Sequence, residues 1–124
     1  MAPGKKETGV IKSKMIDTGQ DNVFYMTFPV NNYFLEKSKS QSRENTFYTF
    51  SIQSNQKEAS FVVHASGTMV KELINMSESY IKPACEETNM PTSNTRNIIT
   101  TRPGIALLEG DKWIIKTKAA IRYE

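Results

Sequence analysis

The chain has 124 residues, of which 38% are hydrophobic and 23% charged, and its net charge is +3. This length fits one domain with a single modest core, and the composition is that of a globular protein, not of a disordered one. No apolar run approaches the ~20 residues of a membrane-spanning helix, and the first residues lack the apolar segment of a secretory signal. We therefore expect a flexible basic tail over 1–7 and a single folded domain over 8–124.

Cysteine and histidine each occur once, as Cys85 and His64. A lone cysteine forms no internal disulfide, which favours a reducing compartment and predicts an intracellular protein, cytoplasmic or nuclear. One cysteine and one histidine do not make a zinc site, and no glycine-rich phosphate loop is present. Neither residue has an acid or base at the spacing of a catalytic motif. The sequence thus predicts no enzyme, no metal and no cofactor.

The positive charge is concentrated at the two ends of the chain. Residues 1–14 and 96–124 carry +3 each, and the residues between them sum to −3. Such clustering suits a polyanion such as nucleic acid. The alternative is ordinary surface charge that keeps a small domain in solution.

Strands are predicted in the first half of the chain. Residues 8–16 alternate apolar and polar side chains, and residues 23–30 are dense in aromatic and β-branched ones. A turn-forming cluster over 17–22 separates them. Residues 31–45 are polar and basic in their second half, so we expect an exposed loop there.

Two more strands and one helix are predicted in the middle of the chain. Residues 46–54 and 59–65 are strongly strand-forming and are joined by a short polar hairpin connection. From 67 to 82 the apolar positions recur at i, i+3 and i+4, which predicts a helix with one buried stripe that Pro83 ends.

The last third returns to extended structure. A polar loop over 83–95 leads to an extended stretch over 96–108, which is broken at a Pro-Gly pair. A tight turn over 109–112 precedes a long final strand over 113–123, whose alternate residues face opposite sides. The complete order, β-β-β-α-β-β, predicts a mainly β protein with one helix, an OB-fold-like five-stranded barrel.

The middle of the chain resembles the single-stranded DNA-binding protein family. The likeness extends over about 8–82 and 105–123, and its clearest part is an aromatic-rich strand, a polar hairpin, a Phe-containing strand, a Gly-containing break and a helix ending in Tyr-Ile-Lys. These elements are Phe47–Ile52, Ser60–Val63, Ser66-Gly67 and Tyr80–Lys82. Residues 102–121, with their Trp-containing stretch, also resemble a coactivator family of the positive-cofactor type. In that family the stretch enters a helix, whereas the alternation after Trp113 predicts a strand.

The resemblance implies a non-enzymatic protein that binds single-stranded DNA or RNA by stacking bases on aromatic rings and neutralising the backbone. It further implies a place in DNA replication, with replication or telomere-type protein partners. An exposed helix stripe or strand edge would also allow a homo-oligomer, and no membrane partner is expected. The alternative function is a small β-barrel assembly subunit of a multiprotein complex without its own affinity for nucleic acid.

Candidate binding residues follow from the strand alternation and the basic positions. Tyr25 and Phe47 share strand faces with polar residues and are predicted to point outward, whereas Phe24, Phe28 and Val30 are predicted to lie in the core. Trp113 begins an apolar face, so it is either a stacking platform or part of the core. On the final strand, the basic residues are expected in one row at about 6.6 Å spacing, or as a charged edge that prevents aggregation. The predicted nucleic-acid-binding residues are Tyr25, Tyr33, Lys37, Lys39, Arg43, Phe47, Trp113, Lys116, Lys118 and Arg122.

Overall fold

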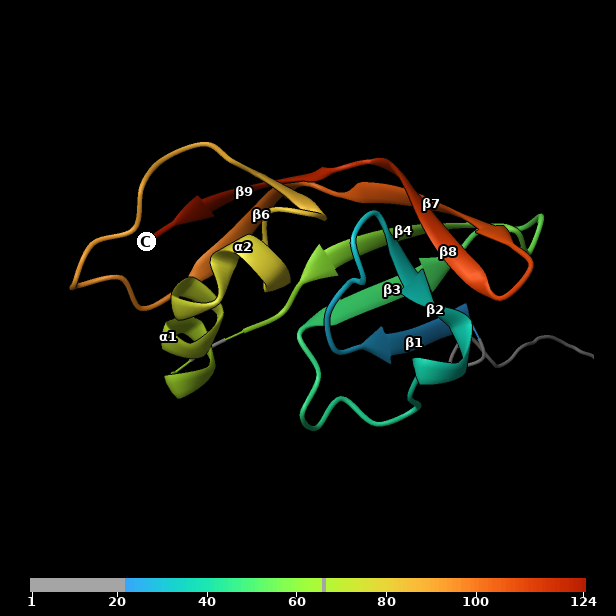
Figure 1. Ribbon diagram of the computed structural model, residues 1–124, viewed down its shortest axis with the longest axis horizontal. Helices are drawn as coiled ribbons and strands as arrows, with labels where there is room; N and C mark the ends of the chain where they lie inside the picture. Colours follow the sequence, from blue (N-terminus) through green and yellow to red (C-terminus); the bar gives the residue numbers. More distant parts are fainter. Residues whose placement is uncertain (1–21, 66) are drawn as a thin grey trace, which may run out of the picture.

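The computed structural model describes residues 22–65 and 67–124 (Figure 1). The predicted tail over 1–7 and the predicted strand over 8–16 lie outside the described residues. Within them, β-strands predominate and two α-helices follow one another in the middle of the chain. The elements are β1 (Val23–Met26), β2 (Tyr33–Leu35), the short 3-10 helix η4 (Glu36–Ser38), β3 (Tyr48–Ile52), β4 (Glu58–Val63), α1 (Thr68–Asn75), α2 (Ser77–Tyr80), β5 (Cys85–Glu87), β6 (Ile98–Arg102), β7 (Gly104–Glu109), β8 (Lys112–Thr117) and β9 (Ala119–Tyr123).

Six strands form an antiparallel sheet in the order β1-β3-β4-β7-β8-β2, and the sheet curls into a half-barrel. Apart from β2, the strands lie across the sheet in the order in which they occur in the chain, and α1, α2, β5 and β6 separate β4 from β7. The curl brings the two edges together, because Ser40, just after η4, exchanges both backbone hydrogen bonds with Tyr25 of β1. The segment 36–40 therefore connects the edge formed by β2 to the edge formed by β1.

A smaller sheet, in the order β5-β9-β6, continues from the large one. Residues 98–123 form one long antiparallel ribbon, with β7 and β8 in the half-barrel and β6 and β9 in the small sheet (Figure 1). The register shifts between Thr100 and Arg102 and again between Ile105 and Ala106. Such irregularities bend a ribbon, which lets a single hairpin serve two sheets.

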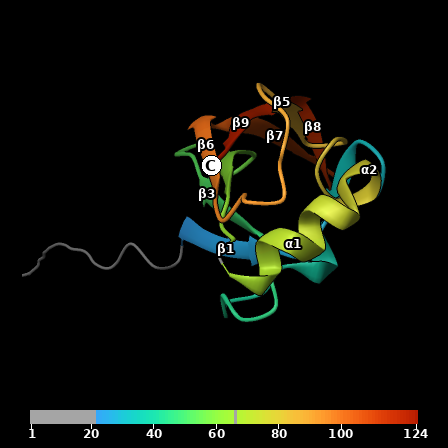
Figure 2. The same cartoon turned by 90° about the vertical axis from the view of Figure 1, so that its left-hand side faces the viewer.

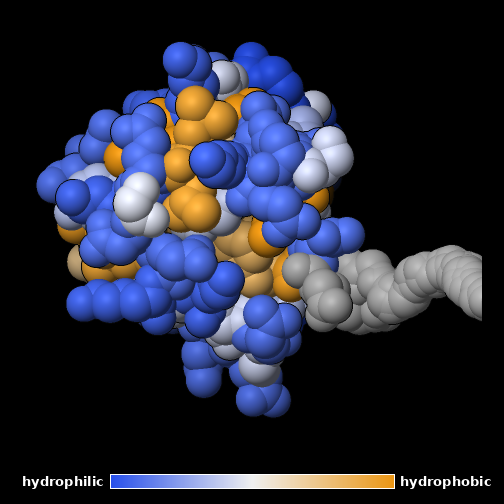
Figure 3. All heavy atoms as spheres, turned by 90° about the vertical axis from the view of Figure 1, so that its right-hand side faces the viewer, coloured by the Kyte–Doolittle hydropathy of each residue, from blue (hydrophilic) through white to orange (hydrophobic). Residues whose placement is uncertain are grey.

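Aromatic side chains fill the half-barrel. Along each strand alternate residues point inward, and the inward positions of β1, β3 and β4 carry Phe24, Phe50 and Phe61. The inner face of β7 has almost no side chain at Gly104, against which the ring of Phe61 packs. Seen from the right-hand end of Figure 1, hydrophobic atoms reach the surface in a band framed by polar ones (Figure 3).

The two helices lie below β6 and β9 in Figure 1 and face the viewer in Figure 2. Val70 and Leu73 of α1 enter the core, as the predicted helical stripe requires. The ring of Tyr80 is stacked between two others, with its centre 4.5 Å from that of Phe28 and 6.0 Å from that of Phe47. This stack fastens α2 to the half-barrel. None of the described helices is long and apolar enough to cross a membrane.

The mainly β class, the strands near 48–52 and 58–63 and the extended conformation after Trp113 are confirmed. Three expectations are wrong in detail. The single helix over 67–82 is two helices, because the backbone of Met76 (φ −114°, ψ 29°) interrupts it. The predicted loops over 31–45 and 83–95 contain β2 and β5, and the large sheet has six strands instead of five.

Candidate nucleic-acid interface

The line along which the two edges of the large sheet meet, here named the barrel seam, gathers aromatic and basic side chains. Lys37 and Lys39 are exposed on the connecting segment, and the half-buried Tyr25 lies directly opposite Ser40. Tyr33 occupies the edge strand β2 at the other side of this segment. Four of the ten predicted binding residues therefore belong to the seam, namely Tyr25, Tyr33, Lys37 and Lys39, whereas Arg43 lines a hollow beside His64.

The two lysines of the seam differ in their surroundings. The Lys39 ammonium lies 2.9 Å from the Glu36 carboxylate and 5.5 Å from the centre of the Phe24 ring. An exposed ion pair of this kind adds little stability, but it keeps the charge near β1. For Lys37 the structure gives no carboxylate partner within residues 22–65 and 67–124. A substitution of Lys37 therefore tests the effect of its positive charge on binding without also breaking an ion pair.

Beside Tyr25, a buried histidine joins the loop before β3 to the sheet. The hydroxyl of Thr46 donates to the carbonyl of Arg43 at 2.6 Å, so it accepts a hydrogen bond from Nε2–H of His64 at 2.9 Å. Nδ1 then accepts from the hydroxyl of Thr49 at 2.6 Å. The ring of Tyr25 meets that of His64 edge-on at 5.8 Å. These contacts place a proton on Nε2 of His64, and the hydrogen bond from Thr49 to Nδ1 is that of the neutral ring.

The pKa of His64 is lowered from its ordinary value. Burial is the larger cause, since it disfavours the charged imidazolium, and the positive charge of Arg43 acts in the same direction. Hydrogen bonds to Thr46 and Arg43 oppose the shift without reversing it. The neutral ring is therefore the form that the fold favours.

We expect the fold to lose stability as the pH falls from about 7 to about 5. Because the pKa of His64 is lower in the folded chain than its unfolded value of about 6.5, the unfolded chain takes up the proton first and acid favours unfolding. Urea midpoints measured across this window should fall in the wild type and change much less in His64→Gln. Equal slopes in the two proteins would contradict this assignment.

A second pairing of ring and charge lies on the outer face of β2 and β8. The ammonium of Lys112 is 5.1 Å from the centre of the Tyr33 ring, within the range of a cation–π contact. Tyr33 lies opposite Ile114, so Lys112 and Lys116 flank it on the same face of the sheet. Lys116 is therefore near the seam, and Lys112 is a candidate that the sequence reasoning missed. It stands in the predicted turn before Trp113, where nothing indicated a facing ring.

Two predicted platforms are buried, and the expectation that they contact bases is wrong for this structure. Phe47 is 7% exposed, because it precedes β3 instead of belonging to its outer face and is covered by Tyr80. Trp113 is 1% exposed, and its indole N–H donates to a carboxylate oxygen of Glu36 at 2.6 Å. Of the two alternatives for Trp113, the structure supports the core. Neither ring is accessible for stacking.

The predicted row of charges on the final strand is also corrected. β8 ends at Thr117 and β9 begins at Ala119, so Lys118 lies between the two strands, and Lys116 and Arg122 belong to different sheets. Arg122 is paired with the carboxylate of Glu124. The charges therefore do not form one evenly spaced line.

Alternation predicts Phe28 in the core, yet this residue is 42% exposed. The reason is that β1 ends at Met26, so the period of two no longer applies beyond it. Val30 is likewise exposed. Pro29, between them, was the available signal that the strand ends early.

Cys85 is buried in the part of the chain that the structure describes. Burial raises the pKa of the Cys85 thiol to about 12, which makes it a poor nucleophile near neutral pH. The hydroxyl of Tyr48 lies 3.7 Å from this sulfur and donates to the carbonyl of Tyr80 at 2.5 Å. Within residues 22–65 and 67–124, no three His, Cys, Asp or Glu side chains are grouped to hold a metal ion.

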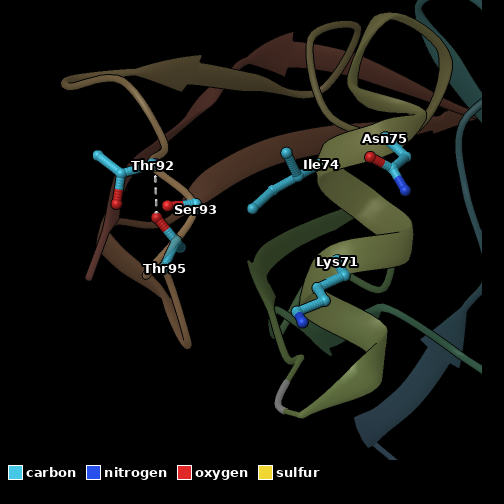
Figure 4. Close-up of a pocket in the computed structure, with 6 residues that line it drawn as sticks. All are labelled: Lys71, Ile74, Asn75, Thr92, Ser93 and Thr95. Carbon is cyan, nitrogen blue, oxygen red and sulfur yellow. Dashed lines mark hydrogen bonds between the residues drawn. The ribbon is translucent and has the colours of Figure 1, made fainter.

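A second hollow of about 260 Å³ lies between α1 and the turn before β6 (Figure 4). Lys71 and Ile74 extend from α1 toward the turn that carries Thr92, Ser93 and Thr95, and Asn75 also contributes to the lining. The hydroxyl of Thr95 accepts a hydrogen bond from the backbone N–H of Thr92 at 2.8 Å, so it stabilises the turn.

No known protein family, curated protein or solved structure matches this chain. The fold and the chemistry of the seam are therefore the basis on which a function is assigned.

Proposed function

We propose that this chain is a non-enzymatic protein that binds single-stranded DNA or RNA along the barrel seam. The observation that carries the proposal is the meeting of rings and positive charges where the sheet edges join. Tyr25 and Tyr33 lie on the two edges, Lys37 and Lys39 lie on the segment between them, and Arg43 follows this segment in the chain. Aromatic rings that alternate with basic groups are typical of surfaces that follow a single strand.

The proposal needs a curled β platform but not a particular family. OB-folds bind single strands on a barrel face with Greek-key connections. Here the strands of the large sheet, except β2, lie in chain order, and β4 and β7 are joined through α1, α2, β5 and β6. The support for nucleic-acid binding is therefore the chemistry of the seam, and the OB-fold itself remains a prediction.

Labelled oligo-dT and oligo-U in a salt series test this function. We expect Lys37→Glu with Arg43→Glu to weaken binding strongly and to lower the salt slope by about 0.7 for each phosphate that is no longer neutralised. Tyr25→Ala should weaken binding by ~1–3 kcal/mol and leave the slope nearly unchanged, since stacking releases no counterions. Fluorescence anisotropy of the oligonucleotide is the suitable readout, because the buried Trp113 does not report on the surface.

Lys57→Glu is the matched control. Lys57 is exposed in the hairpin between β3 and β4, and its carbonyl accepts a hydrogen bond from Leu108 of β7. β4 and β7 are the central strands of the curled sheet, opposite the seam. This variant should bind like the wild type apart from the general decrease in positive charge. Absence of binding by the wild type at low salt would overturn the proposal and favour the assembly subunit.

A further inference from the structure

An apolar groove separate from the rings of the seam lies between the segment after β1 and the first turns of α1. It has a volume of about 260 Å³ and is lined by Thr27, Phe28, Asn45, Phe47, Met69 and Glu72. Pockets for small organic ligands usually begin at about 300 Å³ and enclose most of the ligand. This hollow is smaller and open to one side, so it suits one or two side chains of a larger partner.

The apolar surface continues along the helices beyond the groove. Met69, Met76 and Tyr80 follow one another at helical spacing, and backbone bonds from Met76 to Glu72 and from Tyr80 to Met76 maintain that spacing across the interruption. Met76 is 45% exposed, and the exposed Phe28 is stacked on Tyr80. Methionine and aromatic side chains exposed together are typical of adaptable protein-binding surfaces.

Charge at the groove determines which partner fits. Glu72 is the one charged residue that lines it, and the structure gives this carboxylate no ion pair within residues 22–65 and 67–124. A neighbouring hollow, which shares Asn45 and Met69, adds Glu44 and Arg43 together with the neutral His64. The apolar groove itself is therefore acidic, unlike the basic seam, which argues against a phosphate backbone there.

We propose that this groove is a docking site for a partner protein, which inserts an apolar side chain flanked by an arginine or lysine. The apolar side chain packs against Phe28 and Met69, and the basic residue lies against Glu72. An oppositely charged rim around an apolar centre sets the specificity and orientation of such a contact. This inference does not depend on nucleic-acid binding, since it uses none of the rings and lysines of the seam.

Two short fluorescein-labelled peptides test the site, each with a central Phe-Leu pair, one flanked by arginines and the other by glutamates. We expect the arginine peptide to bind the full chain about tenfold more tightly than the glutamate peptide. Glu72→Arg should reverse this preference. Met69→Ala should lower the affinity for both peptides and leave the preference for the arginine peptide unchanged. Glu109→Arg, at the exposed end of β7, is the control for net charge and should retain the wild-type preference.

Amide chemical shifts in the ¹⁵N-labelled protein locate the contact. The arginine peptide should move the resonances of Phe28, Asn45, Met69 and Glu72. The Lys37→Glu variant should bind this peptide with the affinity of the wild type. Equal binding of the two peptides, an unchanged preference in Glu72→Arg, or shifts confined to other residues would overturn the docking site. Shifts of the same four residues by oligo-dT, with none from either peptide, would instead assign the groove to nucleic acid.

Discussion

Phe50→Ala is expected to remove about 3–5 kcal/mol from the free energy of unfolding. Phe50 is completely buried at the centre of the half-barrel, where its ring lies within 4.9 to 6.1 Å of four others. These are the rings of Phe24, Phe34, Phe61 and Trp113. Truncation leaves a cavity. The surrounding rings cannot move in to fill it, because they are attached to four different strands. Since small domains are stable by only about 5–15 kcal/mol, the variant should be close to unfolding.

Urea unfolding followed by circular dichroism measures this destabilisation, and Phe28→Ala is its control. Phe28 is the same residue type but is 42% exposed, so its removal should cost about 1 kcal/mol or less. Similar destabilisation in the two variants would show that the half-barrel is not packed around Phe50.

Gly104→Val should destabilise the protein by about 3 kcal/mol, because overpacking a dense core forces side chains or backbone to move. A Cβ atom at this position would lie only 2.2 Å from Cζ of Phe61, and two further ring carbons are within 2.7 Å. Gly104 and Phe61 are opposite each other on β7 and β4, so the ring covers the glycine directly. The clash cannot be relieved at the end of a flexible side chain.

A double-mutant cycle separates this clash from other effects of replacing a glycine. Gly104→Ala should cost clearly less in a Phe61→Leu background than in the wild type, with a coupling of about 1–3 kcal/mol. Gly110→Ala is the control, since the position has φ +65° but no neighbouring atom within 4 Å. It should cost about 1–2 kcal/mol through backbone strain alone. A cost for Gly104→Ala that is independent of Phe61 would contradict the packing described here.

The proposed binding surfaces were only partly predictable from the sequence. Tyr25, Tyr33 and the basic positions of the 37–43 segment are recognisable because they interrupt apolar patterns with rings or charges in polar surroundings. Their meeting at one seam is not, since it depends on a hydrogen-bonded bridge between Tyr25 and Ser40. The groove has no signal in the sequence, because Phe28 and Met69 come together only when α1 packs beside the segment after β1.

Local patterns by themselves determined the mainly β class, the strands around Phe50 and Phe61, and a helix beginning near Thr68. A period of two or 3.6 in the apolar positions is a property of residues close in the sequence, so it can be recognised without knowledge of the fold. The tertiary structure alone decided which faces are covered. Phe47 became buried under a helix that follows it in the chain, and the short β5 was stabilised by parallel pairing with the distant β9. Burial and strand pairing depend on partners far along the chain, and only the folded protein brings those partners together.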